Sequence, residues 1–311
     1  MPLAVTMSVY TSVSNKEVEA FLGGYSIGNL KTLRGIENGI TNTNYWLSSE
    51  DREYVLTLYE QHEPQALDYI LGLQQHLGDR DVACSRPVID NQGRLYSILK
   101  GKPAAIIHRV AGEVATELSQ CQCQLIGKEM AKFHLAGQTF PFSRNNPCGH
   151  YWRIALQEKL LPLLTDLEQK LLDEELTAYQ AITDIDLPSG ATHSDLFHDN
   201  CLFNGDILSG IIDFDYACNE SFIYDISISL NDCCIKQDGR LDETLSGSFL
   251  GGYQAIRPLL DVELDQLGLM LRLAATRFWL SRLHDRHFPL AGEMTFTKDP
   301  DVFKNILLLR R

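Results

Sequence analysis

The stretch "HSDLFHDNCLFNGDILSGIIDFD", residues 193–215, carries the strongest fold signal in the sequence. Its first eight residues contain two His, two Asp and an Asn, and an apolar run then leads to Asp213. Two strand-like runs flank Gly205 and Asp206, and this pattern predicts a β-hairpin. Because a hairpin returns the chain to its starting point, we expect Asn200 and Asp213 to lie near one another, with Asp195 close by.

This convergence of oxygen-bearing side chains suits Mg²⁺, which prefers oxygen ligands. The spacing His193-x-Asp195-x-x-x-x-Asn200, followed by Asp213, also matches the catalytic loop of phosphoryl-transfer enzymes with the protein-kinase fold. A zinc site is disfavoured, because His193 and His198 have no third His or Cys placed to help. The alternative without chemistry is a polar hairpin whose Asp and Asn side chains only satisfy turn backbone.

Upstream of this stretch the pattern is rich in strands. Residues 30–49 resemble two strands joined by a Gly/Asn/Thr turn, "EYVLTLYE" (53–60) reads as a third, and "LYSILK" with "AAIIHRV" adds two more. One helical pattern, "PQALDYILGLQQHLGD", begins at Pro64 and stops near Gly78.

After residue 112 the pattern changes to helices. The segments 117–137, 151–182 and 259–285 have helical character, and the middle one is interrupted at Pro162. We therefore expect an α+β, protein-kinase-like, two-lobe fold. Residues 1–107 would form an N-terminal nucleotide-binding lobe with a small antiparallel sheet and one helix. Residues 108–311 would form a mainly helical lobe that carries the catalytic loop and the substrate site.

The first predicted hairpin contains "GIENGITNTN", where kinases cover the ATP phosphates with backbone N–H groups and small residues. Its candidate nucleotide contacts are Gly35, Asn38, Gly39 and Thr41. The lysine that kinases carry on the following strand is missing, since Thr57 stands at its place. Backbone amides, the metal or another cation must then hold the phosphates. The available cations are Lys31, Arg34, Lys100 and Lys102. A degraded, inactive kinase is the alternative explanation.

The composition limits the possible partners. The net charge of −14 argues against a nucleic-acid-binding surface. No apolar stretch of transmembrane length and no secretory signal are apparent, so we expect no membrane partner and a cytoplasmic location. The eight Cys are scattered without zinc-finger spacing, and reduced thiols in the core are the simplest interpretation.

Several stretches resemble the aminoglycoside-phosphotransferase-like small-molecule kinases and, among them, the homoserine kinases of bacterial threonine biosynthesis. The resemblance covers nearly the whole chain from Gly35. The stretches that carry it are "RGIENGITNTNYW", "EYVLTLYE", "THSDLFHDNCLF", "GIIDFDYAC", "YDISISLNDCC", "RFWLSRL" and "KDPDVF". Thr57 in "YVLTLYE" agrees with that branch, which does without the strand lysine.

The resemblance implies an ATP-dependent kinase with L-homoserine as its substrate and Mg²⁺ as its metal. Asp195 would be the catalytic base at the homoserine hydroxyl, and Asn200 and Asp213 would hold Mg²⁺. His193 would support the loop, and we expect His198 and the adjacent Asp199 to take no part in the chemistry.

A zwitterionic substrate also needs a cation for its carboxylate and an acid or carbonyl for its ammonium. The candidate substrate contacts are Asp232, Arg277 and Arg282, although acids of "YDISISLND" could equally pair inside a buried helix. Two other functions stay open. One is a kinase for choline, methylthioribose or an aminoglycoside, and the other is a non-catalytic nucleotide-binding protein. The oligomeric state is open as well.

Overall fold

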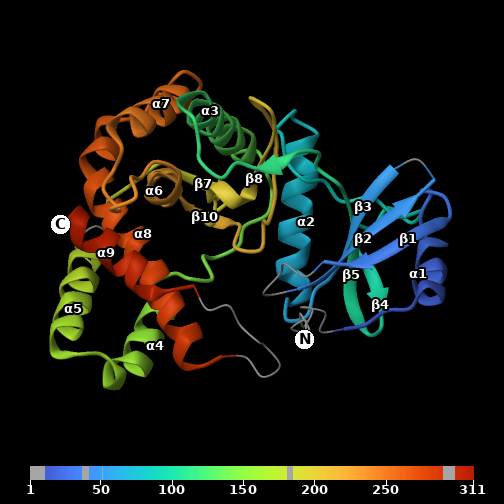
Figure 1. The fold of residues 1–311 in the computed structure, drawn as a ribbon, viewed down its shortest axis with the longest axis horizontal. Coiled ribbons are helices and arrows are strands. Elements are labelled where there is room, and N and C mark those ends of the chain that lie inside the picture. Colours follow the sequence, from blue (N-terminus) through green and yellow to red (C-terminus); the bar gives the residue numbers. More distant parts are fainter. Residues whose placement is uncertain (1–10, 37–41, 51, 181–184, 290–297) are drawn as a thin grey trace, which may run out of the picture. The chain divides into compact units, whose positions relative to one another are not determined.

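The computed structural model describes residues 11–36, 42–50, 52–180, 185–289 and 298–311. The chain divides into two compact units, which are drawn in Figure 1. The described residues up to 79 and 84–110 form the smaller unit, and residues 80–83 join those from 111 onward in the larger one. Among the described residues, no helix combines the length and apolar character needed to cross a membrane.

The smaller unit is built on an antiparallel sheet whose strands follow the order β1-β2-β3-β5-β4. The strands are β1 (Leu30–Gly35), β2 (Thr43–Ser49), β3 (Arg52–Leu58), β4 (Ser97–Leu99) and β5 (Lys102–His108). Side chains along β2 alternate between buried and half-buried, as expected for a strand with one face on a core. The five strands expected from the sequence are confirmed, while the turn between β1 and β2 lies largely outside the described residues.

Two helices complete this unit, α1 (Asn15–Leu22) and α2 (Pro64–Gly78). The expected helix from Pro64 to Gly78 is confirmed at both ends, with Pro64 in the first turn, where its missing N–H costs nothing. Helix α1 is an addition to the expected elements. Its signal is a capping box, in which Ser14 and Glu17 satisfy each other's backbone N–H groups.

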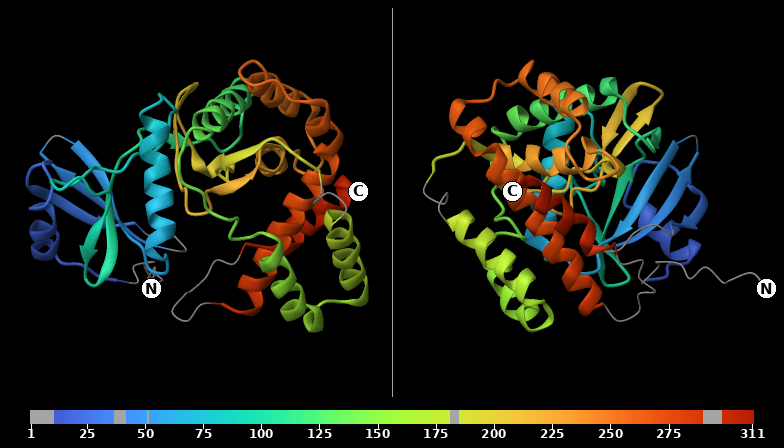
Figure 2. Two further views of the ribbon diagram at one scale, coloured as in Figure 1. Left: turned by 180° about the vertical axis from the view of Figure 1, so that it is seen from behind. Right: turned by 60° about the vertical axis from the view of Figure 1, so that its left-hand side comes forward.

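The larger unit is mainly helical. Its helices are α3 (Gln120–Gly137), α4 (His150–Leu160), the 3₁₀ turn η1 (Leu161–Leu163), α5 (Asp166–Gln180), η2 (His198–Asn200), α6 (Phe222–Cys233), α7 (Glu243–Gln254), α8 (Asp261–His287) and α9 (Pro300–Arg310). The expected interruption at Pro162 is confirmed, because the 3₁₀ turn separates α4 from α5 there. Helices α3 and α7 pack side by side, as do α8 and α9 (Figures 1 and 2).

Short strands of the larger unit lie before, within and after the stretch of residues 193–215. They are β6 (Glu113–Val114), β7 (Ser189–Thr192), β8 (Cys201–Asn204), β9 (Ile207–Ile211) and β10 (Cys218–Ser221). Strand β7 pairs with β10, and β8 pairs with β6 and β9, all antiparallel. The predicted hairpin is therefore confirmed. Gly205 turns it with φ of 61°, a conformation that suits glycine.

Candidate active site

The hairpin brings the two ends of the 193–215 stretch together. Cys201 pairs with Ile211, and the backbone N–H of Ile212 donates to the carbonyl of Asn200 over 3.0 Å. Asn200 in turn donates from Nδ2 to the backbone carbonyl of Asp195 over 2.9 Å. The structure thus places Asp195, Asn200 and Asp213 in one neighbourhood, as the spacing predicts.

Two residues of this loop have an unusual backbone conformation. Ser194 has φ of 61° and Asp213 has φ of 64°, which is the left-handed region that residues other than glycine seldom adopt. Such conformations persist only where the surroundings hold them, and they gather at functional sites. Each of the two lies at or next to a carboxylate of the predicted site.

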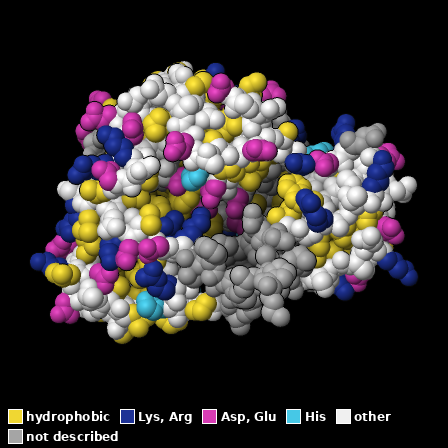
Figure 3. Space-filling view, in the orientation of Figure 1, with side chains coloured by type: hydrophobic (Ala, Val, Ile, Leu, Met, Phe, Trp, Pro, Cys, Tyr) yellow, Lys and Arg dark blue, Asp and Glu magenta, His cyan; other side chains and the backbone are white. Residues whose placement is uncertain are grey.

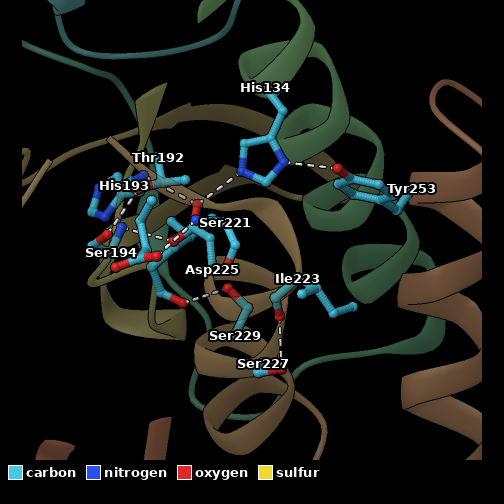
Figure 4. Close-up of polar contacts among 12 residues, drawn as sticks. His134, Thr192, His193, Ser194, Ser221, Ile223, Asp225, Ser227, Ser229 and Tyr253 are labelled. Carbon is cyan, nitrogen blue, oxygen red and sulfur yellow. Dashed lines mark hydrogen bonds and ion pairs between the residues drawn. The ribbon is translucent and has the colours of Figure 1, made fainter. Parts of the chain in front are cut away.

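Asp225, near the start of α6, holds the backbone at Ser194, the first of these two positions. Its carboxylate is fully buried and accepts hydrogen bonds from the backbone N–H groups of His193 (3.1 Å) and Ser194 (2.7 Å). Figure 4 shows His134 of α3 completing the set, with Nε2 3.0 Å from Asp225 and Nδ1 2.8 Å from the hydroxyl of Tyr253. Asp225 therefore stabilises the backbone of the loop at His193 and Ser194. Burial opposes its ionisation, but the bond from His134 and the backbone donors lower its pKa overall.

His193 links the loop to the strand that ends before Asp213. Its Nε2 lies 3.0 Å from the carbonyl oxygen of Ile212, which requires that Nε2 carry the proton. The ring is fully buried and packs against Phe214 with centroids 4.9 Å apart. Burial lowers the pKa of His193, so the ring is neutral at neutral pH. These contacts fit the supporting role expected for it.

Asp195 is paired with Arg277 of α8, whose Nη1 donates to Oδ1 over 2.9 Å. Arg277 is 3% exposed, and its guanidinium packs over the rings of Phe278 (3.8 Å) and Tyr216 (4.6 Å). Burial raises the pKa of Asp195, and the charge and hydrogen bond of Arg277 act against that rise. Arg277, a candidate substrate contact from the sequence, thus orients the predicted base.

Asp213 is solvent-exposed, yet the surrounding protein raises its pKa well above the usual range, and the charges of Asp215 and Asp195 raise it further. The charges of these neighbouring carboxylates oppose the ionisation of Asp213, and a bound cation would relieve this repulsion. The amide oxygen of Asn200 stays available, since the hydrogen bond of that side chain uses Nδ2. One carboxylate and one amide oxygen, completed by phosphate oxygens and water, form a typical donor set for Mg²⁺. The residues therefore fit the expected metal.

The other candidate substrate residues have protein partners. Asp232 accepts from the backbone N–H and from Nδ1 of His198, both over 2.7 Å, and this contact raises the pKa of His198. Arg282 donates to the carbonyl of Asp299 over 3.1 Å and packs over the ring of Phe303. Of the candidate substrate residues, Arg277 therefore contacts Asp195 directly, whereas Asp232 binds the loop residue His198.

Of the candidate nucleotide contacts, Gly35 ends β1, and Asn38, Gly39 and Thr41 lie outside the described residues. Thr57 faces Asn44 on β2 and donates to its Oδ1 over 2.8 Å. Lys31, Lys100 and Lys102 contact Glu50, Glu17 and Glu60, respectively.

Sequence reasoning missed one buried cation, Arg153 of α4. Its side chain is 1% exposed, and Nε, Nη1 and Nη2 have no hydrogen-bond partner among the described residues. The amphipathic pattern of α4 offered little signal, because an arginine on a polar helix normally reaches solvent. Asp225 belongs to the acids of "YDISISLND", for which substrate binding and pairing inside the protein were equally expected. The structure shows internal pairing, and the contacts of Asp225 with His193 and Ser194 span 32 and 31 residues.

Comparison with known proteins places these features in context. Residues 32–259 match the family model described as "Phosphotransferase enzyme family". The chain is 44% identical over 301 residues to a homoserine kinase of Methylobacillus flagellatus, covering 97% of this chain and 94% of that protein. It is also 44% identical over 302 residues to a homoserine kinase of Neisseria meningitidis, covering 97% and 99%.

Solved structures show the same fold at low identity. An amicoumacin kinase in complex with AMP-PNP, Ca²⁺ and its antibiotic matches with a TM-score of 0.72 and 16% identity, covering 96% of this chain and 92% of that one. A spectinomycin phosphotransferase in complex with ADP and spectinomycin matches with a TM-score of 0.68 and 15% identity, covering 95% and 94%. The expected α+β, kinase-like fold class is confirmed.

Proposed function

We propose that this chain, which belongs to the phosphotransferase enzyme family and within it to the homoserine kinases, transfers the γ-phosphoryl group of ATP to the hydroxyl of L-homoserine. The product is O-phospho-L-homoserine, an intermediate of threonine biosynthesis. The family resemblance expected from the sequence motifs is confirmed by relatives that match nearly the whole chain. The observation that carries the assignment is 44% identity over 97% of the chain to homoserine kinases of two organisms.

Asp195 is our candidate for the catalytic base. Its Oδ1 accepts from Arg277, and its backbone carbonyl accepts from Asn200, so that Asp195 is held at both its side chain and its backbone. Its second carboxylate oxygen can then accept the proton of the substrate hydroxyl. Pairing with Arg277 counteracts the rise of pKa that burial causes, which favours the ionised form that a base requires.

For the metal, we propose Mg²⁺ held by Asn200 and Asp213. Bound there, the ion would supply charge that offsets the charge on the phosphate oxygens of ATP during transfer. The chain's own contribution is to orient the two ligands, and the bonds from His193 to Ile212 and from Ile212 to Asn200 do so. For the nucleotide, we propose ATP contacts at Gly35, Asn38, Gly39 and Thr41.

The surface and composition support a small-molecule substrate. Acidic and basic side chains are interspersed over the face seen in Figure 3, and the net charge is −14. A nucleic-acid-binding protein would need clustered Lys and Arg. A cytoplasmic location is part of this proposal. The acidic charge would also suit a cationic acceptor such as choline or an aminoglycoside, which is the argument for the second candidate function.

An acceptor panel tests the proposal. Purified protein with Mg-ATP is offered L-homoserine, choline, methylthioribose or an aminoglycoside, and ADP release is measured. We expect release with L-homoserine alone. Release that depends on choline would support the second candidate, and nucleotide binding without turnover would support a non-catalytic protein. Asp195→Asn serves as the control, since it should remove turnover while nucleotide binding persists.

A further inference from the structure

Arg153 is buried, and within the described part of the chain it forms no ion pair. It lies on α4 with 1% of its side chain exposed, and its three guanidinium nitrogens have no hydrogen-bond partner among the described residues. A guanidinium is charged at all physiological pH values and carries five N–H donors. Burying such a group without an acceptor is expensive, so native proteins pair it or provide it with a ligand. The buried guanidinium of Arg153 therefore favours the binding of an anionic group.

Two tyrosines connect Arg153 to the predicted site. Its guanidinium packs over the ring of Tyr179 on α5 at 4.3 Å. The charge of Arg153 also acts on Tyr224 of α6, whose pKa is raised by burial, and the charge of Arg277 acts on the same hydroxyl. Arg277 is the residue bound to Asp195. Tyr179 and Tyr224 line one cavity together with Leu273, which lies one helical turn before Arg277 on α8.

The other buried arginines already have carboxylate partners. Arg277 donates to Asp195, and Arg257 forms a two-bond ion pair with Glu263 over 3.0 and 3.1 Å. Arg282, a candidate from the sequence, donates to a backbone carbonyl and packs on an aromatic ring. Within the described part of the chain, Arg153 is therefore the buried arginine best able to take an external carboxylate with two parallel hydrogen bonds.

Tyr179 and Tyr224 also line a cavity of about 610 Å³ in the larger unit. Glu220 and Ser221 of β10 contribute to the same wall, and the buried hydroxyl of Ser221 has no hydrogen-bond partner within the ranges that the structure describes. This wall combines an acid and a hydroxyl with the ring of Tyr179, which packs against the guanidinium of Arg153. An amino acid carries both a carboxylate and an ammonium group, and these two charges match Arg153 and Glu220.

We propose that Arg153 binds the α-carboxylate of the amino-acid substrate and so selects homoserine over amino alcohols that lack this group. This inference rests on the proposed function. The N–H donors of Arg153 gain hydrogen-bond acceptors only when substrate is bound, whereas Arg277 stays with Asp195.

The test compares two acceptors that differ in one group. L-homoserine and 3-aminopropan-1-ol share the hydroxyl, the three-carbon spacing and the amine, but only homoserine has the carboxylate. We expect Arg153→Met to lower kcat/KM for homoserine by about 100-fold, chiefly through KM. The value for 3-aminopropan-1-ol should change by less than about threefold, because this acceptor never uses the guanidinium. Arg153→Lys should recover part of the loss, since it keeps the charge without the planar fork.

Arg272→Met is the matched control, because Arg272 is a partly buried arginine of α8 that pairs with Glu175. It should leave the ratio of the two kcat/KM values unchanged, and this ratio does not depend on the fraction of folded enzyme. Without substrate, Arg153→Met should melt at or above the wild-type temperature, because it removes an unpaired buried charge. Added homoserine should then raise the melting temperature of the wild type much more than that of the variant.

Equal losses for both acceptors in Arg153→Met would overturn the role of Arg153, as would an unchanged KM for homoserine. An unchanged KM together with a retained homoserine-induced melting shift in the variant would mean that the carboxylate occupies a separate site, which also contradicts the proposal. Wild-type enzyme that phosphorylates neither acceptor would contradict the proposed function itself. The two failures are therefore distinguishable.

Discussion

The ionisation of the Asp195 carboxyl group depends on a few neighbouring residues. Burial alone would favour its neutral form, and Arg277 counteracts that effect through a 2.9 Å bond. The spacing of Asp195, Asn200 and Asp213 predicts their convergence, because a two-residue turn leaves a hairpin little freedom. The partners of these residues were not predictable. Arg277 lies 82 residues from Asp195, and nothing in a single sequence indicates which distant arginine faces a given carboxylate.

Asp225 offers a prediction at this scale. Asp225→Asn leaves one acceptor oxygen where the carboxylate accepts from two backbone N–H groups and faces His134. We expect the free energy of unfolding to fall by at least about 2 kcal/mol, since bonds to a buried charge are lost. We also expect kcat to fall, because Ser194 loses the contact that holds its positive φ.

Chemical denaturation measures the stability change. Asp238→Asn is the control, because the ion pair of Asp238 with Arg240 is exposed and should contribute less than about 1 kcal/mol. Equal stability of wild type and Asp225→Asn would contradict the supporting role of Asp225.

At the scale of elements, most helices and strands followed from periodicity and from Pro and Gly signals. Helix α2 begins at Pro64 and ends at Gly78, and the hairpin β8–β9 has its turn at Gly205, as predicted. What periodicity did not reveal was the packing of α3 against α7. Two glycines permit this contact. A Cβ on Gly127 would overlap the backbone carbonyl of Phe249, and one on Gly252 that of Gln124.

Gly252→Ala should therefore force α3 and α7 apart and lower the free energy of unfolding by about 2 kcal/mol. Gly251 and Gly247 lie on the same helix, and a Cβ at either position would meet no atom within 4 Å. Alanine there should instead stabilise the protein by on the order of 0.5–1 kcal/mol, because glycine is a poor helix former. Thermal or chemical unfolding of the three variants is the measurement. The same sign of change at all three positions would contradict this account of the packing.

For the whole molecule, the change from strands to helices along the sequence predicted the fold class, because each lobe of this fold has its own periodicity. We propose that the boundary between the N-terminal lobe and the mainly helical lobe lies between residues 107 and 108. Buried ionisable residues also act on the whole molecule, because their protonation changes the free energy of unfolding of the entire chain.

His134 predicts how stability depends on pH. Burial lowers its pKa, and the opposing influence of Asp225 and Glu263 does not restore it, while Arg257 adds to the lowering. Its ring nitrogens already face Asp225 and the hydroxyl of Tyr253. In the unfolded chain the same group takes up a proton below about pH 6.5. The unfolded state thus binds more protons, and the stability that is present above this pH is lost as the pH falls below it.

Melting temperatures between pH 7.5 and 5 should decrease, and the decrease should be smaller in His134→Gln, which cannot titrate. An equal slope for the variant and the wild type would show that His134 does not contribute to the acid sensitivity.

The central claim is that the chain phosphorylates the hydroxyl of L-homoserine. The most direct measurement is phosphorus NMR of a reaction with Mg-ATP and L-homoserine, read beside a matched reaction with choline. We expect a new phosphomonoester signal with homoserine, equal in amount to the ADP formed, and none with choline or with Asp195→Asn. A phosphomonoester formed from choline, or ADP formed without any homoserine ester, would contradict it.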